Sequence, residues 1–316
     1  MDEFQLIRRY FADPAEPRDD VVLGIGDDAA LLRVPPDQDL AVSTDSLVAG
    51  VHFPLDLDPA AIGHRSLASN LSDLAAMGAK PAWVLMALTL PEVDETWLAG
   101  FSQGFFALAK RHGVALVGGN VARGPLNITL TVQGLVPKGK ALTRAGAQVG
   151  DLIYVTGNPG DAAAGLQLLQ AGNKDFTDAC IKRFAYPEPR IAAGEALRGI
   201  ASAAIDVSDG LLADLGHLLE ARGHGAKLGL EKLPLSRDIL KHHAKEEAWK
   251  LALTGGDDYE LCFTAHVTQA AAAEARLKQA GCPVACIGAI EAQAGIHCVD
   301  GAGRLHEYPR PGHRHF

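Results

Sequence analysis

The sequence predicts two consecutive domains, each of which combines α-helices with a β-sheet. In the first half of the chain, short apolar segments typical of strands alternate with longer segments of helical periodicity. The same alternation begins again after Gly146–Asp151, with an expected strand at 152–156 and a glycine-containing turn at 157–160. We therefore expect one domain over residues 1–148 and a second domain over residues 149–316.

The composition is that of a globular protein with an excess of acidic residues. The 316 residues are 48% hydrophobic, and 29 Lys plus Arg against 38 Asp plus Glu give a formal net charge of −9. No segment clusters the basic side chains that bind nucleic-acid phosphates, so we expect no nucleic-acid partner. The N-terminus lacks the apolar core of a signal peptide, and the longest apolar run, Ala82–Leu90, is too short to span a membrane. We expect a cytoplasmic protein without a membrane partner.

The elements of the first half follow from local patterns. Residues 2–11 carry apolar side chains at helical spacing, and Asp58-Pro59 supplies the N-cap and first helical residue of a helix that runs to about Met77. A second helix is expected at about 94–112. Strands are expected at 40–44, 83–90, 115–117 and 128–136, and in the second half at 204–207.

One stripe of the helix expected at 58–77 is small and polar. Its members lie at positions i, i+3, i+4, i+7 and i+11, which share a helix face. They are Ser66, Ser69, Asn70, Asp73 and Met77. Because the stripe ends near a carboxylate, we interpret it as a face open to a ligand.

Five short segments place carboxylates beside glycine, serine or threonine, several of them where an apolar strand ends. They are residues 24–28, 43–45, 70–73, 206–210 and 255–258. Each alone is typical of a turn or a helix N-cap, but five in one chain favour a shared site. Carboxylates gathered together repel each other unless cations neutralise them, and Mg²⁺ prefers such hard oxygen ligands. The pattern predicts several Mg²⁺ ions that bridge acidic side chains to phosphate groups.

Two segments resemble other phosphate-binding motifs, but each departs from its motif at an essential position. Residues 134–141 resemble a P-loop, but Ala141 replaces the serine or threonine that ligates Mg²⁺. Residues 24–29 resemble a dinucleotide fingerprint, but Asp27 and Asp28 would direct negative charge at the pyrophosphate. We expect neither a P-loop nor an NAD site.

Eight segments, in order over nearly the whole chain, resemble the thiamine-monophosphate kinase family. They are GIGDDAALL, STDSLVAGVHF, NLSDLAAMGAKPAW, VGGNVARGPL, ALTRAGAQVGD, VTGNPGDAAAGL, DVSDGLLADLGH and TGGDDYELCF. The resemblance implies an aminoimidazole-ribonucleotide synthetase-like fold, with an N-terminal α/β domain that dimerises through its sheet and a C-terminal α+β domain. It also implies ATP-dependent phosphorylation of thiamine phosphate to thiamine diphosphate, the last step of thiamine diphosphate biosynthesis, by a homodimer.

The resemblance further assigns site residues, position by position. The implied Mg²⁺ ligands are Asp28, Ser43, Thr44, Asp45, Asp73, Asn120, Asp206 and Asp209. The implied ATP contacts are Gly119, Asn120, Arg144 and Ser208. The implied thiamine phosphate contacts are His52, Asp257 and His313. Asn120 stands where many family members have Asp, and His313 stands where an aromatic ring often stacks on the substrate.

The implied reaction needs no protein base. The acceptor is a phosphate whose second pKa is about 6, so it is already largely ionised at pH 7. The protein has to neutralise and align two phosphates that repel each other, so we expect its acids to hold metal ions rather than carry protons.

Three alternatives stay open at this point. One is another synthetase of the same superfamily. A selenophosphate synthetase, however, would need a reactive cysteine near the N-terminal Gly-Asp segment, and no cysteine precedes Cys180. The second is a hydrogenase-maturation relative, which would end in a functional cysteine, whereas this sequence ends with His315 and Phe316. The third is a non-catalytic sensor of nucleotide or thiamine.

Overall fold

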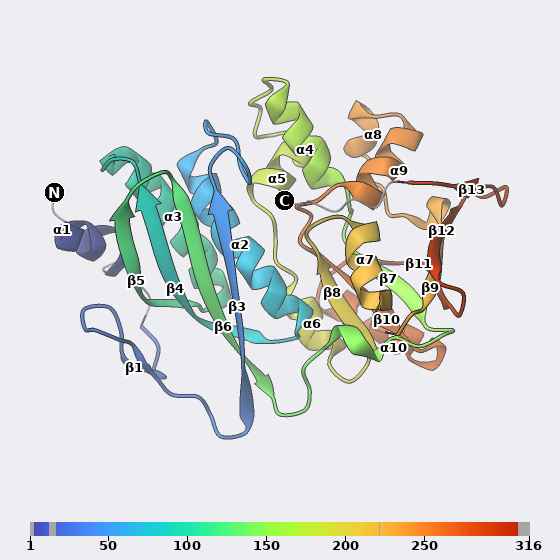
Figure 1. The fold of residues 1–316 in the computed structure, drawn as a ribbon, viewed down its shortest axis with the longest axis horizontal. Helices are drawn as coiled ribbons and strands as arrows, with labels where there is room; N and C mark the ends of the chain where they lie inside the picture. The colour runs from blue at the N-terminus through green and yellow to red at the C-terminus, as the bar shows by residue number, and fades with distance from the viewer. Residues whose placement is uncertain (1–2, 13–16, 221, 309–316) are drawn as a thin grey trace. The chain divides into compact units, whose positions relative to one another are not determined.

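The computed structural model describes residues 3–12, 17–220 and 222–308, which form two units. Unit 1 contains the chain up to Leu74 and Ala79–Gly139, and unit 2 contains Ala75–Gly78 and the chain from Lys140 onward. Each unit has its own sheet and its own helices, as the sequence predicts (Figure 1).

The main sheet of unit 1 has the strand order β3-β6-β4-β5. The strands are β3 (Gln38–Val48), β6 (Asn127–Pro137), β4 (Lys80–Leu90) and β5 (Ala115–Arg123). β4 and β5 are parallel and are connected by helix α3, whereas β6 pairs antiparallel with both of its neighbours. β3 and β5 lie at the two edges and extend beyond the predicted strands, because their added residues are mostly polar or exposed and so form no apolar run.

Helices α2 (Pro59–Ala76) and α3 (Glu95–His112) cover one face of this sheet (Figure 1). On that face Ile128, Leu130 and Val132 of β6 are fully buried. The predicted start of α2 is confirmed, since the Asp58 carboxylate accepts hydrogen bonds from the N–H groups of the second and third helical residues at 2.9 and 3.2 Å.

Most of the polar stripe of α2 is buried, so its interpretation as a face open to a ligand was wrong for Ser66, Ser69 and Asn70. Ser66, Ser69 and Asn70 are buried, and each donates a side-chain hydrogen bond to a carbonyl of its own helix. Asn70 Oδ1 also accepts the backbone N–H of Asp45 at 3.1 Å. Small side chains are needed here because they let α2 approach β3 closely, and only Asp73 and Met77 retain appreciable exposure.

The N-terminal segment contains short elements. The helix expected at 2–11 is an α-helix, α1 (Glu3–Ile7), followed by one π-helical segment over Arg8–Ala12. Strands β1 (Val21–Leu23) and β2 (Leu31–Leu32) pair antiparallel, so residues 24–30 form a loop between two strands and do not begin a helix.

The sheet of unit 2 has the order β13-β12-β9-β11-β7-β10-β8. Its strands are β7 (Leu152–Thr156), β8 (Ala203–Val207), β9 (Gly225–Gly229), β10 (Glu260–Ala265), β11 (Val284–Glu291), β12 (Gly295–Val299) and β13 (Leu305–His306). β12 and β9 are parallel, and the other neighbouring strands are antiparallel. β8 and β10 are buried along their whole length.

Helices of unit 2 connect these strands and form part of its core. They are α4 (Asp161–Gln170), α5 (Ala179–Ala185), α6 (Ile191–Leu197), α7 (Leu211–Glu220), α8 (Ile239–His242), α9 (Lys245–Thr254) and α10 (Ala270–Gln279). Leu211, Leu215 and Leu218 of α7 pack in one hydrophobic cluster with Ile205 and Val207 of β8. None of the helices in the described ranges has both the length and the apolarity to cross a membrane.

Two glycines allow α2 and α3 to pack against each other in unit 1, and they give a test of this contact. A Cβ on Gly104 would lie 1.9 Å from the Ala60 carbonyl oxygen, and a Cβ on Gly63 would lie 2.1 Å from that of Phe101. We expect Gly104→Ala to lower the free energy of unfolding by about 1–3 kcal/mol because the helices must move apart. Thermal denaturation followed by circular dichroism measures this change.

The matched control is Gly216→Ala in α7, where a Cβ would meet nothing within 4 Å. There the substitution should stabilise unit 2 by about 0.5–1 kcal/mol, since alanine loses less conformational entropy than glycine on folding. Equal effects of the two substitutions would contradict the packing described here.

Candidate functional site

In unit 1, strand β3 brings Ser43 next to Asp73 of helix α2. Ser43 Oγ donates a hydrogen bond to Asp73 Oδ2 at 2.5 Å, a distance typical of a hydroxyl on an ionised carboxylate. Asp45 lies two residues along β3, hence on the same face, and its N–H is held by Asn70 of α2. A serine hydroxyl and two carboxylates, all hard oxygen donors, therefore share one face of β3.

Thr44 directs its side chain to the opposite face of the sheet. Its hydroxyl donates to the Leu130 carbonyl at 2.9 Å and lies 3.1 Å from the Thr131 hydroxyl. Strand alternation is the cause, because consecutive side chains point to opposite faces. The three consecutive residues 43–45 thus do not offer three side chains to one ion.

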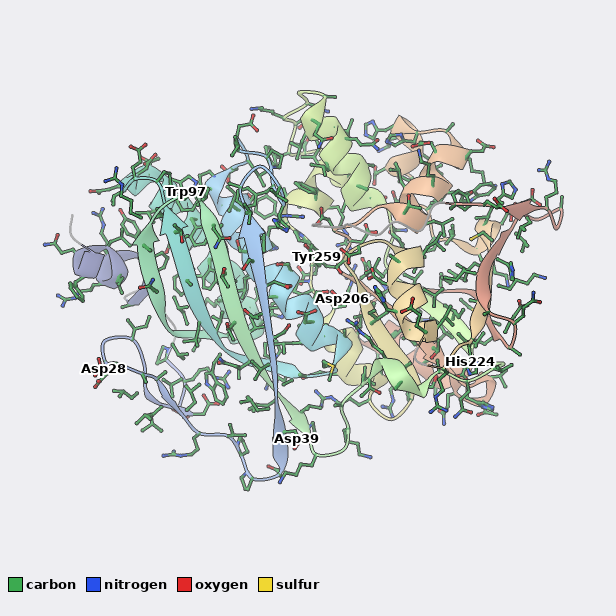
Figure 2. All side chains as sticks on the ribbon, in the orientation of Figure 1. Asp28, Asp39, Trp97, Asp206, His224 and Tyr259 are labelled. Carbon is green, nitrogen blue, oxygen red and sulfur yellow. The ribbon has the colours of Figure 1, made fainter. Side chains whose placement is uncertain are left out.

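Asp28, Gly119 and Asn120 line a cavity of about 850 Å³ in unit 1. The cavity is bounded by the loop 24–30 and by parts of β4, β5 and β6, and Asp28 is exposed at its edge (Figure 2). Neither Ser43 nor Asp73 is among the residues that line it. Asp27 Oδ1 accepts the N–H of Asp28 at 2.8 Å, so Asp27 caps this turn.

Gly119 occupies a place that no other residue fits. Its φ is +150°, and a Cβ there would lie 1.9 Å from the Met86 carbonyl oxygen. The strand pairing between β4 and β5 is irregular just before this point, between the pairs Val84–Leu116 and Leu85–Gly118. The Gly118-Gly119 pair thereby brings β5 backbone to the cavity wall without a side chain in between.

His52 lies in the turn that follows β3. The ring Nδ1 of His52 accepts the backbone N–H of Val48 at 2.9 Å, and the backbone N–H of His52 donates to the Val48 carbonyl at 3.0 Å. The Nδ1 lone pair is therefore used inside the turn, which leaves Nε2 as the nitrogen that carries the proton of the neutral ring. The half-buried ring presents a hydrogen-bond donor on a fixed backbone.

In unit 2, Asp206, Ser208 and Asp209 lie where β8 ends and α7 begins. Asp206 is buried, while the other two are half-buried. The Asp214 carboxylate, in the first turn of α7, accepts the N–H groups of Ser208 and Asp209 at 3.0 and 3.1 Å. Burial raises the pKa of Asp214 to about 6, and the charge of Asp209 adds to the rise. Sequence reasoning missed Asp214, although an acid in the first turn of a helix is a recognisable capping signal.

A second loop, Gly255–Tyr259, runs beside this segment. The N–H of Asp257 donates to the Ser208 carbonyl and that of Tyr259 to the Val207 carbonyl, both at 2.8 Å. Gly256 permits the approach, since a Cβ there would lie 2.6 Å from Ser208 O. Asp257 is thereby brought next to the segment that carries Asp206 and Asp209; Asp206 and the neighbouring Tyr259 are labelled in Figure 2.

A cavity of about 350 Å³ opens beside Asp257. It is lined by residues of α4 and α9 together with Gly255, Gly256 and Asp257. Its walls mix apolar side chains such as Leu166 and Leu251 with polar ones such as Gln167 and Lys250. The cavity can receive a small organic group next to a carboxylate.

Behind this loop lies a buried cluster of charged side chains. Glu260 is fully buried and accepts hydrogen bonds from Arg183, from Arg190 at 2.6 Å and from the Thr156 hydroxyl at 2.6 Å. Both oxygens of the buried Asp258 carboxylate accept the Gly160 N–H at 2.9 Å. Burial raises the pKa of Asp258, whereas the Gly160 N–H and Arg183 act in the opposite direction. These contacts give both acids a structural role inside unit 2.

One predicted residue lies apart from these groups, and another cannot be placed in the described part of the chain. Arg144 is exposed in a short 3-10 helix (Arg144–Gly146), and the preceding Thr143 carbonyl accepts the N–H of Ala204 in β8. His313 lies outside the described residues.

The oxygen donors of the candidate site suit Mg²⁺, although few acidic side chains lie together in either unit. Within residues 3–12, 17–220 and 222–308, no group of three or more His, Cys, Asp or Glu side chains could by itself hold a metal ion. The Ser43–Asp73 pair and the Asp206–Asp209 segment nevertheless offer only oxygen ligands, and Mg²⁺ is held in proteins by one or two carboxylates plus phosphate oxygens and water. The residues present therefore fit this ion.

Comparison with known proteins matches both halves of the chain. Residues 26–136 match the family model of the AIR synthase related protein, N-terminal domain, and residues 148–300 match that of the C-terminal domain. The thiamine-monophosphate kinase of Escherichia coli strain K12 is 50% identical over 319 residues, which cover 99% of this chain and 98% of that protein.

Two solved structures are also similar. The crystal structure of thiamine-monophosphate kinase from Stenotrophomonas maltophilia K279a has 44% identity and a TM-score of 0.88, covering 97% of this chain and 98% of that one. The structure named AaThiL complexed with AMPPCP and TMP has 29% identity and a TM-score of 0.78, covering 99% and 97%. The predicted aminoimidazole-ribonucleotide synthetase-like fold is confirmed, and the chain belongs to the thiamine-monophosphate kinase family within the AIR synthase-related proteins.

Proposed function

We propose that this protein transfers the γ-phosphoryl group of ATP to thiamine phosphate, with ADP and thiamine diphosphate as products. The observation that carries the proposal is the 50% identity to the Escherichia coli kinase over the full chain. The AaThiL structure supports it, because AMPPCP is an analogue of ATP and TMP is the acceptor. The acidic and glycine-containing loops described above supply the residue types that the reaction needs.

We assign phosphate and metal binding to residues of both units. In unit 1, the residues that would hold Mg²⁺ are Asp28, Ser43, Asp45 and Asp73. The backbone at Gly119 and Asn120 would approach ATP, and the side-chain carbonyl oxygen of Asn120 would be a further, uncharged ligand of the metal.

In unit 2, Asp206 and Asp209 would hold Mg²⁺, and Ser208 and Arg144 would contact ATP. When bound, Mg²⁺ neutralises phosphate charge at these acids. Thr44 would contribute through its backbone, because its hydroxyl faces the other side of the sheet.

Thiamine phosphate is assigned to His52, Asp257 and His313. His52 suits the phosphate end, since its hydrogen bonds with Val48 fix the ring in the turn and leave Nε2 as the nitrogen that carries the proton. Asp257 suits the organic end, since a carboxylate repels phosphate but attracts the cationic thiazolium and accepts from an amino group. The cavity beside Asp257 is large enough for such a ring.

The proposed chemistry is direct, in-line transfer without a protein base. The acceptor phosphate is mostly ionised at pH 7, so no side chain has to remove its proton. The residues then act by holding the two phosphates in line and by neutralising their charge, as is usual in enzymes that transfer phosphoryl groups. Asp45, Asp73 and Asp209 are ligand holders in this scheme rather than proton carriers.

We further propose that the domain of residues 1–148 mediates a homodimer through its sheet. The face opposite α2 and α3 carries the apolar side chains of Leu40, Val42 and Val48 from β3, which are 37–58% exposed. A row of exposed apolar side chains on a sheet is typical of an interaction surface. A second copy of the chain would cover this face.

The first test is the reaction itself. The purified protein with ATP, Mg²⁺ and thiamine phosphate should form thiamine diphosphate and ADP in equal amounts, as measured by chromatography. Omitting thiamine phosphate should abolish ADP formation. Release of inorganic phosphate without thiamine diphosphate would show an ATPase or a phosphatase instead.

A second test concerns the acids on and beside β3. Asp45→Asn and Asp73→Asn should each lower kcat at limiting Mg²⁺ by at least about tenfold, because an amide oxygen lacks the charge that binds the ion. Raising Mg²⁺ should restore part of the loss. Asp39→Asn is the matched control: Asp39 is an exposed residue of the same strand and has no assigned role (Figure 2). Near-full kcat in both variants at limiting Mg²⁺ would refute these assignments.

A third test distinguishes direct transfer from a phosphorylated protein intermediate. Rapid quenching after mixing with γ-labelled ATP should place the label only in ATP and thiamine diphosphate, because no protein side chain accepts the group. Label retained on the denatured protein, and chased into product by thiamine phosphate, would contradict direct transfer.

A further inference from the structure

The loop that carries Asp257 has an unusual backbone. Asp257 has φ of +70° and Tyr259 has φ of +50°, and they are the non-glycine residues with positive φ in the described part of the chain. Asp tolerates the left-handed region because its short side chain bonds locally, but a bulky aromatic residue there is a genuine outlier. Such strain persists only where the surroundings over-determine the conformation.

The surroundings hold this loop from both sides. The N–H groups of Asp257 and Tyr259 are bound by the carbonyls of Ser208 and Val207 at 2.8 Å. Between them, the buried Asp258 is pinned by the Gly160 N–H at the start of α4. Immediately after them, the buried Glu260 is held by Arg183, Arg190 and Thr156. The strained conformation is thus built into the core of unit 2.

This conformation has one consequence for the assigned substrate residue. Tyr259 is buried, with 8% of its surface exposed, and its hydroxyl donates a hydrogen bond to Asp257 Oδ1 at 3.1 Å. The left-handed backbone at Asp257 and Tyr259 lets a side chain two residues away reach back to the carboxylate. A hydrogen bond to an ionised acceptor is stronger than one between neutral groups and selects one carboxylate orientation.

We propose that Tyr259 is a positioning residue for substrate binding: its hydroxyl orients the Asp257 carboxylate toward the organic part of thiamine phosphate in the adjoining cavity. The inference rests on the proposed function, because it takes thiamine phosphate as the ligand of Asp257. Tyr259 acts through Asp257 and does not itself contact the substrate. Its contribution is preorganisation, so its loss weakens binding of one substrate and leaves the chemical step intact.

The test is the variant Tyr259→Phe, which removes the hydroxyl and keeps the buried ring. We expect KM for thiamine phosphate to rise about tenfold, with kcat and KM for ATP within about twofold of wild type. The matched control is Tyr154→Phe. Tyr154 is another buried tyrosine of unit 2 whose hydroxyl donates to a carboxylate, Glu274 Oε1, at 3.2 Å, and it has no assigned role. This variant should leave all three constants unchanged, and the two variants should have similar melting temperatures.

A second variant asks whether the effect passes through Asp257. Asp257→Ala should raise KM for thiamine phosphate at least as much as Tyr259→Phe does, since Tyr259 cannot contribute more through Asp257 than Asp257 itself contributes. A smaller effect of Asp257→Ala, an unchanged KM in Tyr259→Phe, or a loss confined to kcat or to ATP binding would each overturn the proposal. A wild-type protein that forms no thiamine diphosphate would overturn the proposed function as well, whereas an active wild type with an unaffected Tyr259→Phe variant would overturn the positioning role alone.

Discussion

The candidate site in unit 2 depends on the backbone hydrogen bonds that join two acidic loops. The carbonyls of Val207 and Ser208 accept the N–H groups of Tyr259 and Asp257, and these bonds continue the antiparallel pairing of β8 with β10. Carboxylates on neighbouring loops repel each other, and this repulsion favours separation of the loops. The hydrogen bonds between the two backbones oppose it, because they join neutral groups and one of the two segments is a buried strand. This backbone pairing places Asp206, Asp209 and Asp257 on one edge of the sheet at the cost of concentrating negative charge there.

The acidic residues in and around these loops fall into two groups that differ in burial. Asp214 and Asp258 are buried and accept backbone N–H groups, so they shape the loops from inside. Burial raises the pKa of both because the charged form loses its hydration. Asp209 and Asp257 are half-buried, and the proposed function assigns them to metal binding and substrate binding. Some acidic residues of the chain thus shape unit 2 from inside, and the proposed function uses others to bind ligands.

Much of this organisation could be predicted from the sequence, and the failures have physical causes. Buried strands such as β7 and β8 form apolar runs, and the start of α2 has an Asp-Pro signal, so both kinds of element were predicted within about a residue. The edge strands β3 and β5 were predicted too short because exposed strand residues carry no such signal. The polar stripe of α2 was misread because small polar side chains also suit a close helix–sheet contact, in which the helix backbone satisfies their hydrogen bonds. Spacing alone does not separate these two uses.

The positive φ of Tyr259 could not be predicted from sequence at all, and its identity argues for function. Glycine would adopt φ of +50° without strain, and the strain of a bulky residue there costs of order 1–3 kcal/mol. A loop shaped only for packing would gain stability from glycine at this position, as nearby Gly255 and Gly256 illustrate where backbone approaches are close. A tyrosine offers what glycine lacks, namely a buried ring that anchors the loop and a hydroxyl that reaches Asp257. Phenylalanine would supply the ring alone, so under the proposed function the hydroxyl and its bond to the Asp257 carboxylate are the features that would link this strained residue to thiamine phosphate binding.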